Sequence, residues 1–295
     1  MDRVLLTGTN SYIGTNYRKF SQQKDIEEVS LIENDPEEID FSNYDVILHL
    51  AAIVHQSKKI PESEYFKINR DLCLKTAIKA RNDGVRQFIF LSTLKVYGGF
   101  NNDNSVRNED SPCFPDDNYG KSKYEAELEL RKLENKKFKV SVIRTPLVYG
   151  EGVRANMLRL IKLVDRLRFL PFGCIDNRRN LTYIENLTGF IDRVIETGKS
   201  GVFVVMDEGA ISTTKLVRLL ARDLNRNICL FKLPEFIVRI GYLLKPDTFK
   251  SLFGSLEVNN DKTKVILNYK PPLTTEEGLR RTVSAYQDIK NKGCE

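Results

Sequence analysis

The sequence predicts an α/β protein built around a doubly wound parallel sheet, and three observations support this fold class. Short β-branched runs alternate with longer amphipathic segments through the first half of the 295 residues, as expected where crossover helices connect parallel strands. A glycine-containing turn follows the first of these runs. Charged (29%) and apolar (41%) residues occur in globular proportions, so the whole chain is expected to fold.

Strands and helices alternate in the first half of the chain. Strands are expected at residues 4–7, 29–32, 46–50, 88–92 and 140–143. Helices are expected at residues 13–20, 68–80 and 119–134. This order predicts one sheet-based domain over residues 1–150.

After Pro146 the pattern is less regular, because glycines and prolines interrupt it. Residues 151–295 are expected to form a smaller, mainly substrate-binding region, with parts of residues 175–206 returning to the first domain. The expected helices are residues 157–167, 187–196, 215–224 and 236–244, and the expected strands are residues 181–184 and 202–206. The helix at 236–244 is strongly apolar. We expect it to be buried, with contact to a membrane surface as the alternative.

Composition and charge argue against several classes of protein. The net charge of +6 comes from scattered Lys and Arg rather than one basic stripe, so no nucleic-acid binding is expected. Five well-separated cysteines and two histidines show no metal-ligand spacing, so no metal site is expected. No apolar run approaches the roughly 18 residues that span a bilayer. We expect a reduced, cytoplasmic protein.

The segment after the first strand has the properties of a dinucleotide-binding turn. Gly8 ends the strand and Gly14 lies in the first turn of the next helix, so the backbone from Gly8 through Ser11, Tyr12 and Ile13 to Gly14 is expected to face a pyrophosphate. Ser11 stands where a second glycine is usual. Its hydroxyl can donate to phosphate, although its Cβ limits how closely the backbone approaches. An ordinary strand-turn-helix is the alternative.

Glu33 follows the second expected strand. An acidic residue there binds the adenosine ribose hydroxyls and repels a 2′-phosphate, which favours NAD as the cofactor, with NADP as the alternative. Glu33 is otherwise one solvated residue of the acidic stretch at 33–38. Together, the turn and this residue specify the fold as a Rossmann-type doubly wound parallel sheet with a smaller C-terminal substrate-binding region.

The strongest catalytic pattern combines Thr93, at the end of an expected strand, with Tyr119 and Lys123. Tyr119 and Lys123 are four residues apart on an expected helix, so they share one face. A Lys ammonium there stabilises a phenolate and lowers the Tyr pKa from its usual value of about 10, as proton transfer requires. A chance Tyr-x-x-x-Lys spacing is the alternative.

These motifs resemble the extended short-chain dehydrogenase/reductases, the family of NAD-dependent nucleotide-sugar epimerases and dehydratases. The similarity covers nearly the whole chain and includes Asn69 and residues 40–41, 46–52, 90–98, 143–150 and 179–186. The resemblance implies that Asp40 and Phe41 contact the adenine and that Leu50, Ala51 and Ala52 line the cofactor. It further implies that Tyr119 and Lys123 contact cofactor, that Thr93 and Tyr119 contact the sugar, and that Arg179 binds the nucleotide diphosphate.

Within that family the sequence is most similar to a group from bacterial surface-polysaccharide synthesis, UDP-N-acetylquinovosamine dehydrogenases and relatives labelled UDP-glucose 4-epimerase. Leu94 and Lys95 replace the acidic pair of the 4,6-dehydratases, so dehydration is not expected. Leu147 replaces an Asn of the well-known galactose epimerases.

The expected function is therefore an NAD(P)-dependent oxidoreductase acting at carbon 4 of a UDP-hexose. A 4-keto sugar reductase is the first interpretation, and a 4-epimerase with tightly bound NAD is the alternative. A non-catalytic dinucleotide-binding protein is a third. The resemblance also implies a homodimer formed by the helices that begin near Ser63 and at Tyr119.

Overall fold

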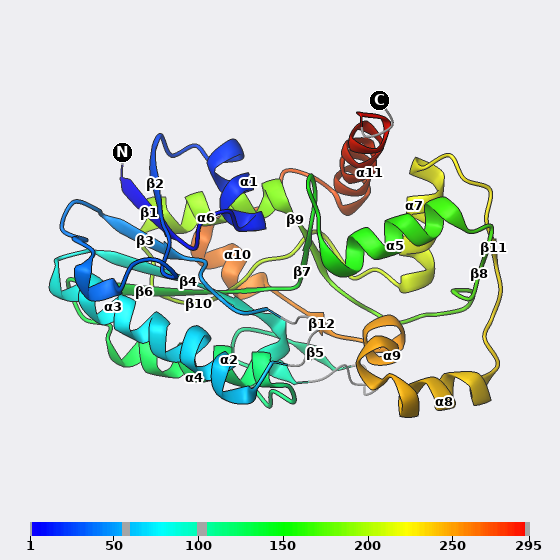
Figure 1. Ribbon diagram of the computed structural model, residues 1–295, viewed down its shortest axis with the longest axis horizontal. Helices are drawn as coiled ribbons and strands as arrows, with labels where there is room; N and C mark the ends of the chain where they lie inside the picture. The colour runs from blue at the N-terminus through cyan, green and yellow to red at the C-terminus, as the bar shows by residue number, and fades with distance from the viewer. Residues whose placement is uncertain (1, 55–59, 99–104, 293–295) are drawn as a thin grey trace.

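A parallel sheet forms the centre of the protein (Figure 1). In the computed structural model, which describes residues 2–54, 60–98 and 105–292, six strands pair in the order β10-β6-β4-β3-β1-β2. These strands are β1 (Arg3–Thr7), β2 (Asp25–Val29), β3 (Val46–His49), β4 (Gln87–Thr93), β6 (Lys139–Thr145) and β10 (Gly201–Val204). Every neighbouring pair is parallel, so all carboxyl ends lie at one edge. The predicted doubly wound α/β fold is confirmed.

Helices cover both faces of this sheet, because its side chains alternate between two apolar layers (Figure 1). Leu6 and Leu48 belong to a core cluster with α6, whereas Leu5 and Ile47 belong to a second cluster with α3 and α4. One face carries α1 (Tyr12–Phe20) and α6 (Ile184–Thr197). The other carries α2 (Glu62–Phe66), a π-helical stretch (Lys67–Leu72), α3 (Cys73–Asn82) and α4 (Asn118–Lys132).

The C-terminal region lies at one end of the sheet (Figure 1). Its helices are α5 (Ala155–Arg166), α7 (Thr213–Asp223), α8 (Glu235–Leu244), α9 (Pro246–Phe253) and α11 (Thr275–Lys292), whereas α10 (Asp261–Leu267) packs on α6 beside the sheet (Figure 1). Short parallel pairs join it together: β7 (Leu147–Tyr149) with β9 (Leu181–Tyr183), β8 (Phe169–Leu170) with β11 (Cys229–Leu230), and β5 (Val106–Arg107) with β12 (Glu257–Val258). Short 3-10 turns occur at Pro36–Glu38 and Leu94–Tyr97. The chain returns to the sheet through α6 and β10.

The expected strand at residues 29–32 is wrong. The strand is β2, which ends at Val29, because residues 25–29 pair with residues 3–7 of β1. Residues 31–34 form a turn instead, and the Asn34 backbone N–H donates to the Ser30 carbonyl oxygen at 3.2 Å. Ile32, whose β-branched side chain favoured the strand, is 98% exposed.

The apolar segment at 236–244 is a helix, as expected, but the expectation that it is buried is wrong. Helix α8 packs on α9 and leaves most of its large apolar side chains in contact with solvent. Among the described residues, none of the helices has the length and apolarity needed to cross a membrane.

A buried ionic network fixes α4 against the sheet. The Arg144 guanidinium on β6 binds the Glu127 carboxylate on α4, with Nη2 to Oε2 at 2.6 Å and side chains only 4% and 1% exposed. The Ser92 hydroxyl on β4 donates to the same carboxylate. The network therefore joins α4 to two central strands.

Removing one member of this network leaves a buried charge without its partner. We expect Glu127→Gln to lower the free energy of unfolding by about 3 kcal/mol, measured by urea denaturation. Glu129→Gln on the same helix is the control. Its pair with Lys132 is exposed, so the change should stay below about 0.5 kcal/mol. Equal effects of the two substitutions would contradict the role assigned to the network.

Candidate active site

In doubly wound sheets a ligand crevice is expected at the switch point of the strand order, which here lies where β1 and β3 end side by side, with β2 next to β1 on the other side. Gly8 follows β1 with a φ of +98°, a conformation that favours glycine. A Cβ there would lie 2.9 Å from the Ala51 backbone nitrogen. The Leu50 N–H donates to the Thr7 carbonyl oxygen at 3.0 Å. The structure thus brings Gly8, Leu50 and Ala51 together, with Ala52 next along the chain.

Ser11 caps the helix that opens onto this crevice. Its Oγ accepts a hydrogen bond from the Gly14 N–H at 3.0 Å, so a serine in place of the usual glycine stabilises the first turn of α1. The Ser11 hydroxyl still has its proton to donate. The amides of Tyr12 and Ile13 lie in that first turn, where helix geometry provides no intrahelical acceptor. Gly8, which has no room for a Cβ, and these amides together form a turn that fits a dinucleotide pyrophosphate.

The residues expected around the adenosine lie in different surroundings. Strand β2 ends at Val29, whose carbonyl oxygen accepts from the Gly8 N–H. Ser30 is therefore the first residue beyond the carboxyl end of this strand, and Glu33 lies exposed in the turn that follows. Asp40 is also exposed, and its carboxylate accepts from the backbone and hydroxyl of Ser42. The Phe41 side chain is fully buried in the core, and its backbone N–H donates to the Asp83 carboxylate at 3.0 Å. Adenosine contacts by Glu33, Asp40 and Phe41 stay predictions.

Tyr12 and His49 are buried close to the crevice. The Tyr12 hydroxyl lies beside Gly150, and burial raises the pKa of its phenol. Burial, with the nearby charge of Lys123, lowers the pKa of His49 to about 3. His49 Nδ1 lies 2.9 Å from the Thr7 hydroxyl. His49 is therefore a neutral structural side chain, rather than a proton carrier at neutral pH.

Thr93 and Tyr119 meet at the carboxyl edge of the sheet. Thr93 is the last residue of β4, and Tyr119 lies in the first turn of α4, where Asp117 Oδ1 accepts from the Gly120 N–H at 2.6 Å. Burial raises the Tyr119 pKa above its usual value, the Asp117 carboxylate raises it further, and a hydrogen bond with the Thr93 side chain opposes both. The phenol therefore keeps its proton at neutral pH, the form needed to donate to an oxygen.

Lys123 lies one turn further along α4 but does not act on Tyr119 as expected. Its Nζ donates to the Leu91 carbonyl oxygen at 2.9 Å and lies 4.3 Å from the centre of the Phe90 ring. Burial lowers the Lys123 pKa to about 8. The expectation that its ammonium lowers the Tyr119 pKa is wrong for the protein without cofactor, because burial dominates at both residues.

Two further residues position this site. Lys95 forms an ion pair with Asp117, and its Nζ lies 5.9 Å from the centre of the Tyr119 ring. The sequence showed Lys95 only as a departure from the dehydratases. Asn69 is fully buried and bonds both the N–H and the carbonyl of Ile53, at 2.8 and 3.0 Å, and the Ser122 hydroxyl at 3.0 Å. It ties the chain after Ala52 to the helix that carries Tyr119.

Arg179 contacts α9 in the C-terminal region. Its Nη1 donates to the Ser251 carbonyl oxygen of α9, and burial lowers its pKa to about 10, so it stays charged at neutral pH. The preceding residue of α9, Lys250, reaches Asp116 at 3.4 Å, and Asp116 is three residues before Tyr119 in the sequence. Arg178 is exposed and pairs with Glu257, as side-chain alternation along an extended segment predicts.

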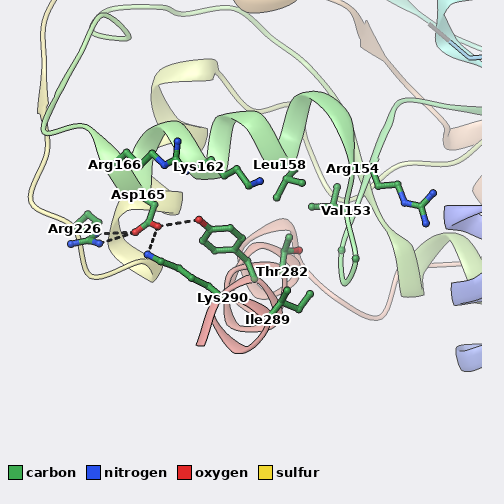
Figure 2. A pocket seen from close by; sticks show the side chains of 13 residues that line it. Val153, Arg154, Leu158, Lys162, Asp165, Arg166, Arg226, Thr282, Ile289 and Lys290 are labelled. Atoms are coloured by element: carbon green, nitrogen blue, oxygen red, sulfur yellow. Dashed lines mark hydrogen bonds and ion pairs between the residues drawn. The ribbon is translucent and has the colours of Figure 1, made fainter. Parts of the chain in front are cut away.

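A separate pocket of about 720 Å³ lies between α5 and α11 (Figure 2). Asp165 lies at one end, where Arg226, Lys290 and the Tyr286 hydroxyl converge on its carboxylate (Figure 2). The pocket includes none of Thr93, Tyr119, Lys123 or Arg179. The pocket is therefore separate from the candidate active site.

Comparison with known proteins identifies the family. The sequence profile of the NAD dependent epimerase/dehydratase family matches residues 4–205. The chain belongs to this family. It is 34% identical to a UDP-glucose 4-epimerase of Vibrio cholerae over 98% of this chain and 97% of that protein. It is 28% identical to the N-acetyl-α-D-glucosaminyl-diphospho-ditrans,octacis-undecaprenol 4-epimerase of Escherichia coli O157:H7, over 96% and 94% of the two chains.

Solved structures share the fold. The UDP-glucose 4-epimerase of Thermotoga maritima, solved with UDP-glucose, superposes with a TM-score of 0.78 at 20% identity, covering 97% of this chain and 99% of that one. The resemblance inferred from the motifs is confirmed. So are the NAD(P) cofactor class and the assignment as an enzyme of the NAD dependent epimerase/dehydratase family.

The lowered Lys123 pKa gives a prediction about stability and pH. The unfolded chain binds the Lys123 proton more tightly than the folded chain, so between about pH 8 and 10.5 the unfolded state carries more protons. The free energy of unfolding therefore gains a contribution from Lys123 that rises with pH, by up to ~3 kcal/mol.

Lys123→Met removes that contribution. We expect the stability of the wild type relative to Lys123→Met to increase across this interval in urea denaturation of the protein without cofactor. Other titrating groups are common to both proteins and cancel in the comparison. A difference that does not change with pH would show that Lys123 has an ordinary pKa.

Proposed function

We propose that this protein is an NAD-dependent 4-epimerase of a UDP-hexose. The hydrogen bond between the Thr93 and Tyr119 side chains at the carboxyl edge of β4 is the observation that carries the proposal, because it puts a phenol that can exchange a proton beside a second hydroxyl. Similarity to a UDP-glucose 4-epimerase over almost the whole of both chains supports it.

The residues divide the reaction among them. When bound, the nicotinamide cofactor accepts a hydride from carbon 4 of the sugar and returns it. Tyr119 would act as the phenolate, which it becomes by losing its proton to solvent when the cofactor binds. It would take the proton of the hydroxyl at carbon 4 as the hydride leaves that carbon and give it back as the hydride returns, while the Thr93 hydroxyl orients the oxygen. Lys123, one turn further along α4, would hold the ribose next to the nicotinamide. Arg179 binds the diphosphate with paired, charge-assisted hydrogen bonds.

A 4-keto sugar reductase is the second candidate, and Leu147 favours it, because galactose epimerases carry an Asn there. Both reactions use the same residues, so the cofactor balance separates them. Purified protein should be incubated with UDP-glucose, UDP-N-acetylglucosamine and a UDP-4-keto-6-deoxy sugar, with and without NADH or NADPH. Products without added cofactor support the epimerase. Consumption of reduced cofactor with the keto sugar alone would replace it by the reductase, and no turnover would indicate a dinucleotide-binding protein.

Tyr119→Phe tests the proton transfer. The substitution removes the phenol hydroxyl and keeps the ring, so turnover should fall by about 10²-fold or more while NAD binding changes little. Tyr124→Phe on the same helix is the matched control and should keep near wild-type turnover. Near wild-type turnover of Tyr119→Phe would remove Tyr119 from the mechanism.

Arg179 and Arg178 provide a second matched pair. Arg179→Ala should weaken UDP-sugar binding by roughly 1.5–3 kcal/mol, the value of a hydrogen bond to a charged group, with NAD affinity unchanged. Arg178→Ala should have a much smaller effect, because that side chain pairs with Glu257 on the surface. Calorimetric titration distinguishes the two. Equal weakening by both, or by neither, would reject this place for the diphosphate.

Homodimer formation stays part of the proposal. The outer surfaces of α3 and α4 would form the interface, and they expose Ile78 and Leu128, each 40% accessible. NAD is the proposed cofactor, with Glu33 as the residue that disfavours the 2′-phosphate of NADP. The position of Ser30 at the strand edge makes it the first residue to replace if Glu33 has no effect on cofactor preference.

A further inference from the structure

Helix α8 carries an apolar stripe on the surface of the protein. Phe236, Ile237, Ile240, Leu243 and Leu244 are 62, 38, 50, 83 and 75% exposed. Their spacing places all five within about a third of the circumference of the helix. The stripe is continuous along all of α8, which lies at the border of the molecule (Figure 1). Contiguous exposed apolar surface of this kind marks a site of interaction.

Packing on the other side of α8 fixes the direction in which the stripe faces. The Tyr242 and Phe249 rings lie 5.9 Å apart, and Phe249 of α9 stacks on Phe253 at 5.5 Å. Gly241 is buried against the Phe249 ring, so closely that a Cβ would lie 2.0 Å from it. The glycine therefore permits tight packing of α8 on α9. This orientation turns the stripe away from the protein.

Basic residues accompany the stripe. Lys232 lies three residues before α8, and Lys245 follows its last residue. Arg239 lies on α8 itself, beside the stripe, and all three side chains are exposed. Glu235 is the single acidic residue from position 228 to 245. Apolar side chains flanked by exposed cations are complementary to the acyl boundary and headgroups of an anionic bilayer.

We propose that α8 docks this protein on the surface of an anionic lipid bilayer. The stripe enters the boundary between headgroups and acyl chains, and Lys232, Arg239 and Lys245 bind headgroup phosphates. A second copy of the chain fits less well, because a two-fold contact through the stripe would bring the Arg239 side chains of both copies, like charges, into the interface.

Docking would place the candidate diphosphate site close to the bilayer. Helix α9 packs directly on α8 and provides the Ser251 carbonyl that accepts from Arg179. The docking itself does not depend on the proposed reaction, because it rests only on the exposed residues of α8 and the adjoining cations.

Vesicle binding tests the proposal directly. The purified full chain should float with vesicles of phosphatidylcholine and phosphatidylglycerol in a density gradient, and less with phosphatidylcholine alone. Substituting Phe236, Leu243 and Leu244 together by Ser should reduce partitioning by about tenfold or more. Val265→Ser is the control, since Val265 is an exposed apolar residue of α10, 82% accessible, away from the stripe.

A second variant separates charge from apolar contact. Lys232→Glu with Arg239→Glu should weaken binding to phosphatidylglycerol vesicles and remove its dependence on salt, while catalytic turnover in solution is unchanged. Failure of the wild type to float, or flotation of both variants like the wild type, would overturn the proposal. Detection of a dimer by light scattering without vesicles, together with its dissociation by the triple Ser substitution, would also overturn the proposal. The stripe would then join two copies of the chain.

Discussion

The buried interaction of Glu127 with Arg144 and Ser92 determines where the catalytic helix lies. Helix α4 carries Tyr119 and Lys123, and its position depends on one carboxylate that accepts from two adjacent strands of the sheet. In a protein interior, such charges are stable only when each finds its partner in good geometry. A shift of α4 along the sheet would break this pairing. The interaction therefore keeps Tyr119 beside Thr93 at the end of β4.

Burial, rather than pairing of charges, sets the protonation of the site. It raises the pKa of Tyr119 and lowers those of Lys123 and His49. Each shift favours the neutral form, as expected where water is largely excluded. The site without cofactor thus holds a protonated phenol and a neutral imidazole, with an ammonium close to its titration point. A charged ligand that enters this crevice therefore meets few charged side chains that would compete with it electrostatically.

The C-terminal region adds two surfaces with different chemistry to one helical hairpin. The inner side of α9 holds the Arg179 side chain, whereas the outer side of α8 exposes apolar residues. Gly241 makes this arrangement compact, because it lets the Phe249 ring contact the α8 backbone. The proposed diphosphate contact of Arg179 and the proposed surface contact of α8 are thereby joined through a few aromatic rings, so the two proposed functions are separable by substitution but close in space.

Local patterns in the sequence determined the types and order of the elements of the sheet and the turn at Gly8, and they predicted the candidate catalytic residues Thr93, Tyr119 and Lys123. These depend on residues near one another in the chain, through periodicity, turn chemistry and helical spacing. Residues from distant segments decided the rest. Pairing with β1 ends β2 at Val29 instead of Ile32, and the Lys123 ammonium binds the Leu91 carbonyl oxygen and lies over the Phe90 ring.

Residues from distant segments also decided the exposure of α8 and the direction of the Arg179 side chain. An apolar helix has the same sequence pattern whether or not another element covers it, and only the packing of α9 on one side leaves the other open. Alternation predicted that Arg178 and Arg179 diverge. Which of them turns inward was decided by the Ser251 carbonyl and by Glu257, which come from segments far along the chain. Tertiary contacts decide such questions because burial and charge pairing depend on neighbours in space rather than in sequence.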